Sequence, residues 1–270
     1  MDAGRRDAAD LGRSLCIITG ASRGLGWALS MVLAPRLMPG SHLVLVARSG
    51  GRLQQLEARL LEESPGTGGQ VRLSRVEADL SREEGLQRVL DTVTSTEGAP
   101  PDRLLLINNA GSLGDLSKFV IDFTQPAEVS NYMTLNFTSC MCLTASLLKA
   151  FPKRENFHRT VVNISSLCAA QPFKSWSLYC SGKAAREMMF RVLAAEEPDV
   201  RVLNYAPGPL DTDMQKQARL ETADSELRQT FLTMHQEGRL INCHDSAQKL
   251  VNILIRDDFP SGAHIDYYDQ

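Results

Sequence analysis

The stretch Leu15-Cys-Ile-Ile-Thr-Gly-Ala-Ser-Arg-Gly-Leu-Gly26 decides the fold of this chain. Its first four residues are apolar and predict a short buried strand. The glycines that follow permit a tight turn and a close approach of backbone to phosphate, and an amphipathic helix then runs to about Leu37. Strand, glycine loop and helix in this order are the context in which a dinucleotide pyrophosphate lies on a helix N-terminus. The stretch therefore predicts a dinucleotide-binding loop that contains Gly20, Gly24 and Gly26.

Apolar runs alternate with helical patterns along the rest of the chain. We expect strands at residues 42–47, 71–77, 104–107, 160–164 and 200–205, with helices between them. This alternation predicts an α/β fold with a doubly wound parallel sheet, the Rossmann fold. The chain has 270 residues and no evident linker or repeat, so we expect a flexible N-terminus at 1–13 and a single NADP-binding domain at 14–270.

The end of the second expected strand bears on the choice of cofactor. Folds that bind NAD usually place an acidic side chain there, against the adenosine ribose. Here the position offers Arg48, with Ser49 beside it and Arg23 in the glycine loop. Because cations suit a 2′-phosphate, we expect NADP(H); the alternative is that Arg48 is only a solvated strand end. Asp79, after the third strand, is expected to accept from the adenine amino group.

Tyr179 and Lys183 are spaced i, i+4 in a helical segment, which places both on one helix face. An ammonium beside a phenol favours the phenolate. We therefore expect Lys183 to lower the pKa of Tyr179 and to make it a better proton donor to a developing alkoxide. Ser166 follows an expected strand, from which its hydroxyl can reach the same carbonyl oxygen. The alternative is a chance Tyr-x-x-x-Lys on an ordinary helix.

Composition narrows the possible partners. A net charge of −3 argues against binding to nucleic acid or to an anionic membrane. No signal peptide or membrane span is expected. The six cysteines and five histidines show no ligand spacing, so we expect no metal and reduced thiols in a cytosolic protein.

Residues 129–148 carry no ionised side chain and are expected to form a helix. Such a helix favours two-fold packing against a second copy; the alternative is a helix covered by its own chain.

Several motifs together resemble those of the short-chain dehydrogenase/reductase family. They are the segments 19–26, 108–111 and 207–208, with Asp79, Asn136, Ser166, Tyr179 and Lys183. The resemblance covers nearly the whole chain except residues 1–13 and 62–70. It implies that Ser166 polarises a substrate carbonyl and that Tyr179 donates the proton. Lys183 is then expected to hold the nicotinamide ribose, and Asn136 a water of the proton relay.

The resemblance also implies a cytoplasmic homodimer and an NADP(H) site. The residues that it places around the cofactor lie in the glycine loop, at the strand ends and after the strand at 200–205. They are Gly20, Ser22, Arg23, Gly24, Leu25, Gly26, Arg48, Ser49, Asp79, Leu80, Asn109, Tyr179, Lys183, Leu210, Thr212, Met214 and Gln215.

The segments 107–115, 161–168, 203–214 and 261–269 carry a narrower resemblance. They are similar to members of the family that reduce side-chain ketones of pterins with NADPH, in the last steps of tetrahydrobiopterin synthesis. Two other functions remain open. One is a broad-specificity carbonyl reductase for dicarbonyls or quinones, and the other is a regulator that binds NADPH without catalysis.

The expected substrate-binding residues are Ser166, Trp176, Gly208 and Asp266. Phe173, Trp176 and Met214 flank the expected site and can wall a flat ring, or can be ordinary core. The Asp266 carboxylate can accept two adjacent donors of a pterin in a fork, with Gly208 leaving room for the ring. The alternative for Asp266 is that it caps the end of the chain.

Overall fold

A sheet of seven parallel strands forms the centre of the computed structural model, which describes residues 10–63, 71–95 and 100–269. The strand order is β3-β2-β1-β4-β5-β6-β7. The strands are β1 (Ser14–Thr19), β2 (His42–Ala47), β3 (Arg72–Glu77), β4 (Arg103–Asn108), β5 (His158–Ile164), β6 (Val200–Ala206) and β7 (Ala263–Asp266). The order reverses between β1 and β4, so the predicted doubly wound α/β fold is confirmed.

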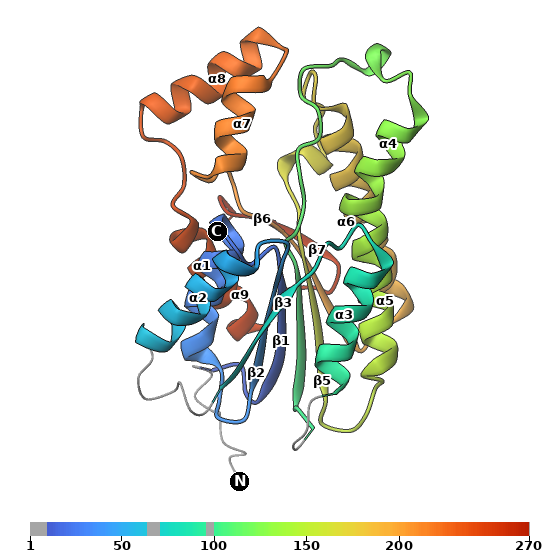
Figure 1. The fold of residues 1–270 in the computed structure, drawn as a ribbon, viewed down its shortest axis with the longest axis vertical. Coiled ribbons are helices and arrows are strands. Elements are labelled where there is room, and N and C mark those ends of the chain that lie inside the picture. The colour runs from blue at the N-terminus through green and yellow to red at the C-terminus, as the bar shows by residue number, and fades with distance from the viewer. Residues whose placement is uncertain (1–9, 64–70, 96–99, 270) are drawn as a thin grey trace.

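Helices cover both faces of this sheet (Figure 1). One face carries α1 (Gly24–Leu33), α2 (Gly50–Glu63) and α9 (Cys243–Arg256). The other carries α3 (Glu83–Thr94), α4 (Pro126–Met133), α5 (Ser139–Ala150) and α6 (Ser177–Glu196). All six residues of β1 are buried, which is why that strand reads as a continuous apolar run rather than an alternating one. Within the described ranges, no helix has the length and apolar character needed to cross a membrane.

Two helices stand apart from these layers, beyond the carboxyl ends of the strands (Figure 1). They are α7 (Asp213–Glu221) and α8 (Ser225–Gln236). The excursion that contains them leaves the body at Leu210 and returns at Ile241, and these two residues pair in an isolated parallel bridge. Near the start of α6, the ring of Trp176 stacks on Phe231 of α8 at 5.2 Å between centroids, and its indole N–H donates to Thr222 at 3.0 Å. The excursion is therefore anchored both at its base and along its length.

Two predicted boundaries differ from the structure. The α-helix after the glycine loop ends at Leu33 instead of Leu37, because Pro35 has no N–H to continue the hydrogen-bond ladder and a 3-10 turn follows. The predicted domain start at Ser14 is too late. Leu11 is buried at 2% exposure, and its N–H donates to the carbonyl oxygen of Arg36 at 2.9 Å. Residues 1–9 of the predicted N-terminal segment lie outside the described residues.

The predicted uncharged helix contains a feature that the sequence did not indicate. Between α4 and α5 the chain makes a π-helical segment, Thr134–Thr138, with Asn136 buried inside it. The N–H of Ser139 reaches the carbonyl oxygen of Thr134, and the hydroxyl of Ser139 bonds the carbonyl oxygen of Leu135 at 2.6 Å. Such widened turns occur frequently at functional sites.

Candidate active site

The loop between β1 and α1 forms a cradle of bare backbone. Gly20 and Gly24 have φ of +69° and +54°, a region that glycine adopts readily. A Cβ on Gly26 would lie 2.2 Å from the carbonyl oxygen of Gly20, so no side chain fits there. The carboxamide of Asn109, after β4, donates to the carbonyl oxygens of Thr19 at 2.8 Å and Gly20 at 3.2 Å. The loop is therefore fixed by the protein itself, with the N-terminus of α1 opening onto it.

Charged side chains lie at the strand ends beside this cradle. Arg48 directly follows β2 and is exposed. Arg23 directly precedes α1, and its guanidinium lies 2.7 Å from the carboxylate of Asp213, with both side chains more than half exposed. The carboxylate of Asp79, after β3, accepts from the N–H and the hydroxyl of Ser81 at 3.0 and 2.7 Å. These bonds hold the pKa of Asp79 below its ordinary value, so the carboxylate stays ionised.

The remaining predicted cofactor residues lie at the carboxyl ends of the strands or in α7: Ser22 and Leu25 in the glycine loop, Ser49 and Leu80 after β2 and β3, and Leu210, Thr212, Met214 and Gln215 after β6. Thr212 caps α7, and its methyl carbon would lie 3.2 Å from a Cβ on Gly24. Gln215 is buried, and its carboxamide donates to the carbonyl oxygen of Phe231 at 3.4 Å and accepts from Arg219. The Gln215 side chain therefore ties α7 to α8, and its amide groups are already bonded within the chain.

Ser166, Tyr179 and Lys183 meet at the carboxyl end of β5. The Oγ of Ser166 caps a 3-10 turn by accepting from the N–H of Cys168 at 3.2 Å, and Ser166 lies near enough to the Tyr179 hydroxyl to lower the pKa of that phenol. The Lys183 nitrogen lies 5.4 Å from the centroid of the Tyr179 ring and donates to the carbonyl oxygen of Ile164 at 2.6 Å. The structure thus brings together the three residues that the sequence assigned to one reaction.

Burial sets the protonation of this group. It raises the pKa of Tyr179 and Cys168 adds to the rise, whereas the Ser166 hydrogen bond and the charge of Arg186 lower it. Burial also lowers the pKa of Lys183 to about 7, and the charge of Arg186 acts in the same direction. The pKa of Tyr179 is therefore raised rather than lowered as predicted, because removal from water is the largest cause. At neutral pH the phenol keeps its proton.

Asn136 lies in the π-helical segment and is 4% exposed. Its carboxamide oxygen accepts from the N–H of Ser112 at 2.8 Å. Its nitrogen donates to the Ser112 hydroxyl at 3.1 Å and to the carbonyl oxygen of Tyr132 at 2.9 Å. The side chain therefore fastens the loop after β4 to α4.

Trp176 packs beside Tyr179 in an aromatic cluster. Its ring is 5.4 Å from that of Tyr179 at an interplanar angle of 87°, and 5.8 Å from that of Phe173. Met214, the third residue predicted to wall a flat ring, is 37% exposed on α7. Phe173 and Trp176 thus meet in packed surroundings next to the phenol, while Met214 stands at the surface.

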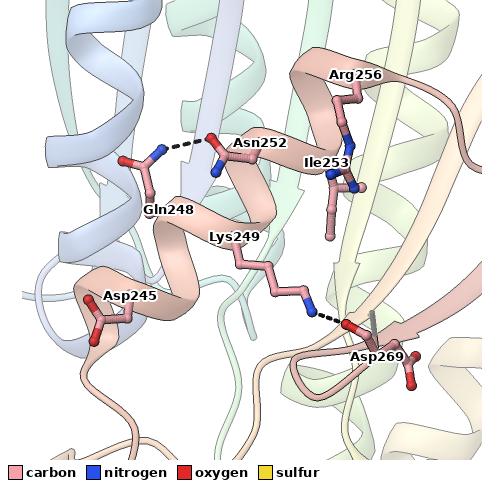
Figure 2. Close-up of a pocket in the computed structure, with 7 residues that line it drawn as sticks. All are labelled: Asp245, Gln248, Lys249, Asn252, Ile253, Arg256 and Asp269. Atoms are coloured by element: carbon pink, nitrogen blue, oxygen red, sulfur yellow. Dashed lines mark hydrogen bonds between the residues drawn. The ribbon is translucent and has the colours of Figure 1, made fainter.

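Asp266 is the last residue of β7, where it pairs with Ala206 of β6. One carboxylate oxygen accepts from the N–H of Tyr268 at 3.0 Å, so the carboxylate does cap the turn that ends the chain. Lys249 of α9 fixes the same turn by donating to the carbonyl oxygens of Tyr267, at 2.7 Å, and Asp269 (Figure 2). The cap uses one lone pair of a group that has about four acceptor sites.

Gly208 follows β6 and has a φ of +74°. A Cβ at this position would lie 2.3 Å from the Cδ1 of Ile241 and 3.5 Å from the Cβ of Tyr267. A larger residue at this position would thus displace the side chain of Ile241. The glycine instead lets the loop after β6 approach the turn that follows Asp266.

Comparison with known proteins decides the family. The chain matches the short chain dehydrogenase family over residues 14–223. The chain belongs to this family. It is 56% identical over 263 residues to sepiapterin reductase from Bos taurus, covering 96% of each chain, and 53% identical over 272 residues to that from Rattus norvegicus, covering 100% of each. The structure of L-sorbose reductase from Gluconobacter frateurii, complexed with NADPH and L-sorbose, has a TM-score of 0.78 at 26% identity and 97% coverage of both chains.

These relatives confirm the family predicted from the sequence and the narrower resemblance to pterin reductases. A short-chain dehydrogenase is an oxidoreductase, so the chain is an enzyme of that class.

Sequence reasoning missed one residue of this short-chain dehydrogenase's site. Arg186 is 1% exposed and donates to the carbonyl oxygens of Asn108 at 2.6 Å and Ala110 at 3.0 Å, and to the Oδ1 of Asn163 at 2.9 Å. It joins the ends of β4 and β5 to α6 through three neutral acceptors. The available signal was its spacing, because a residue seven positions after Tyr179 is nearly two helical turns along and shares its buried face.

Proposed function

We propose that this short-chain dehydrogenase is an NADPH-dependent carbonyl reductase that reduces side-chain ketones of pterins. The observation that carries the proposal is the meeting of Ser166, Tyr179 and Lys183 at the end of β5. The glycine cradle follows β1, two strands away in the sheet and hence about 10 Å distant across it. The similarity to sepiapterin reductases supports a pterin as the substrate.

The residues at the cradle fit NADP(H). The positive φ values of Gly20 and Gly24 let the loop turn tightly onto the N-terminus of α1, where a pyrophosphate can lie against backbone N–H groups. Arg48 is exposed and supplies a cation for a 2′-phosphate. Arg23 joins it by exchanging its exposed partner Asp213, since a surface ion pair is worth only about 0–1 kcal/mol. The bound cofactor supplies the hydride.

The chain's own residues supply and control the proton. A carbonyl oxygen placed beside the Ser166 and Tyr179 hydroxyls accepts hydrogen bonds from both. Because burial raises the pKa of Tyr179, the phenol keeps its proton until a strong base such as an alkoxide develops. Lys183, whose pKa is about 7, holds the nicotinamide ribose and exchanges protons readily at neutral pH, which restores the phenol.

Asp266 is proposed to anchor the pterin ring. A pterin has two adjacent donors on one edge, the 2-amino group and the ring N3–H, and a carboxylate accepts both in a fork. Strands β5, β6 and β7 are neighbours, so Asp266 lies about 10 Å across the sheet from the residues that follow β5. A bicyclic ring with a short side chain spans that interval and brings its ketone to Ser166.

The proposal is tested by measuring NADPH oxidation with sepiapterin and with a small diketone that lacks the amino-pyrimidine edge. We expect a preference for the pterin of about a hundredfold in kcat/KM, the worth of two charge-assisted bonds. Equal rates would favour the broad-specificity reductase instead. NADPH binding without turnover of either substrate would favour the non-catalytic regulator.

We also propose a homodimer built on α5 and α6. Met141 on α5 and Met188 and Val192 on α6 are 47%, 55% and 45% exposed, on helices that lie side by side on one face of the sheet (Figure 1). The exposure of Met141 supports the dimer over the alternative of an uncharged helix covered by its own chain. Two-fold packing of these faces buries the apolar side chains. Sedimentation that shows only monomer at micromolar concentration would contradict the dimer.

A cytoplasmic location is part of the same proposal. All six cysteines are free thiols, including the pair formed by Cys168 and Cys180. Thiols stay reduced in the cytosol, whereas neighbouring cysteines in secreted proteins form disulfides. Fractionation of cells that express the chain tests the location.

A further inference from the structure

Two cysteines flank the residues proposed to carry the reaction. Cys168 lies two positions after Ser166, in the 3-10 turn Leu167–Ala169, and Cys180 directly follows Tyr179 in the first turn of α6. Both side chains belong to one apolar cluster that also contains Tyr179. The 3-10 turn packs against α6, and the partly buried Cys180 packs against the cluster to which Cys168 belongs.

The two thiols differ in exposure and in acidity. Cys168 is 4% exposed, whereas Cys180 is partly exposed, with its Sγ 3.9 Å from the carbonyl oxygen of Gln171. A hydrogen bond from Cys168 lowers the pKa of Cys180 to about 7, and backbone donors at Phe173 and Cys180 act in the same direction. The same hydrogen bond raises the pKa of Cys168. An accessible thiolate beside a buried thiol is the pairing in which the first is oxidised and the second resolves it.

The other cysteines lack this combination. Burial raises the pKa of Cys16 to about 12 and that of Cys243 to about 11, and it also raises the pKa of Cys140. Cys142 is exposed on α5, a helix that carries neither Ser166 nor Tyr179. Cys180 is therefore the thiol on which oxidation is expected to begin.

We propose that peroxide converts Cys168 and Cys180 into a reversible disulfide that switches off the reductase activity. The Cys180 thiolate attacks one oxygen of hydrogen peroxide, the O–O bond breaks, and hydroxide leaves to give a sulfenic acid. The Cys168 sulfur then attacks the Cys180 sulfur, and its proton leaves with the sulfenic hydroxyl as water. Two thiols and one peroxide thus give one disulfide and two waters, with two electrons passing from sulfur to oxygen.

The disulfide disturbs the proposed reaction because of where its ends lie. Non-bonded heavy atoms stay about 3.5–4.0 Å apart, whereas a disulfide draws its sulfurs to about 2.05 Å. The N–H of Cys168 donates to the Oγ of Ser166, so a shift of the 3-10 turn moves that hydroxyl. Tyr179 adjoins the other sulfur. A displacement of about 1 Å at a reacting group can slow turnover about a hundredfold.

The test treats the full-length enzyme with hydrogen peroxide and then with dithiothreitol. Mass spectrometry without reduction reads the bond, and pterin turnover is assayed before and after each step. In the wild type we expect a linked peptide pair two hydrogens lighter than the free thiols, turnover reduced about a hundredfold, and recovery with dithiothreitol. Cys180→Ser should resist peroxide, and Cys168→Ser should be inactivated without recovery because its sulfenic acid oxidises further.

Cys243→Ser is the matched control, since it removes another partly buried thiol and should respond to peroxide as the wild type does. Absence of the linked peptide, full turnover of the linked enzyme, or inactivation of Cys180→Ser at the wild-type rate would each overturn the proposal. Cys180 is partly exposed, so its variant stays informative even if Cys168→Ser fails to fold. The proposed switch rests on the proposed function, whereas formation of the disulfide is measured separately, by mass spectrometry. A linked enzyme with no pterin turnover before oxidation would count against the function alone.

Discussion

The inner end of the site and its rim differ in how their polar groups are bonded. At the inner end, Asn136 and Arg186 are buried, and each makes three hydrogen bonds within the chain. At the rim, Arg48 is exposed, Arg23 holds a surface partner, and the Asp266 carboxylate accepts from one N–H of its own turn. The polar groups at the inner end are thus bonded within the chain, whereas those proposed to bind a ligand at the rim are exposed or hold few partners.

The largest effect is expected at the inner end. Tyr179→Phe removes the proposed proton donor but keeps the ring that packs on Trp176. We expect NADPH binding to be retained and kcat to fall roughly 10²–10⁴-fold for every carbonyl substrate, the usual worth of a positioned general acid. Steady-state kinetics and NADPH fluorescence titration check this. Near-full turnover would mean that another group donates the proton.

Variants of Asp266 distinguish the rim from the inner end of the site, because they should affect a pterin more than a small diketone. Asp266→Asn keeps an oxygen for the N–H of Tyr268 but loses the charge, whereas Asp266→Ala loses both. If the carboxylate anchors a pterin, both variants should lose about a hundredfold in kcat/KM with a pterin and little with a small diketone. A loss confined to Asp266→Ala and equal for both substrates would show that the residue only caps the turn.

A variant of Arg48 tests whether the rim of the site binds the 2′-phosphate of the cofactor. Arg48→Asp should weaken NADPH about ten- to a hundredfold, since each charge-assisted contact is worth about 1.5–3 kcal/mol, and should weaken NADH much less. Arg23→Ala is the companion variant, with a smaller loss because its ion pair with Asp213 must first open. Equal losses of affinity for NADPH and NADH would show that Arg48 does not bind the 2′-phosphate.

The last prediction concerns stability, not catalysis, and involves Lys183. Its pKa falls from an ordinary 10.5 to about 7 in the folded chain, so between these values the unfolded chain binds more protons. Stability should therefore rise with pH across this window, by up to about 1.4 kcal/mol per pH unit, and the full penalty for burying the charge applies below it. Urea unfolding of the wild type and Lys183→Met from pH 7 to 10 isolates the slope, which the variant should lack. Identical slopes would show that Lys183 folds with its charge.

The parts of the fold that follow local patterns could be predicted from the sequence. Residues 42–47 coincide with β2, and the glycine loop lies where the strand–loop–helix order placed it. The missed features depend on contacts between distant residues. The acceptors of Arg186 come from two strands far earlier in the chain, and the neighbour that fills the space beside Gly208 is Ile241. The protonation of Tyr179 could not be predicted either, because it depends on how deeply helix α6 is buried.

The bridge between Leu210 and Ile241 makes the α7–α8 excursion a replaceable unit. Both of its ends leave the body at one point, so the register of β6 and β7 is set without it. Lengthening such an insertion costs only a slowly growing loop-closure entropy, about 0.6 kcal/mol for each doubling. The contacts of Trp176 with Phe231 and Thr222 then decide how a new insertion docks. Within one scaffold, this segment can thus vary in length and sequence while the strand order and register of the sheet stay the same.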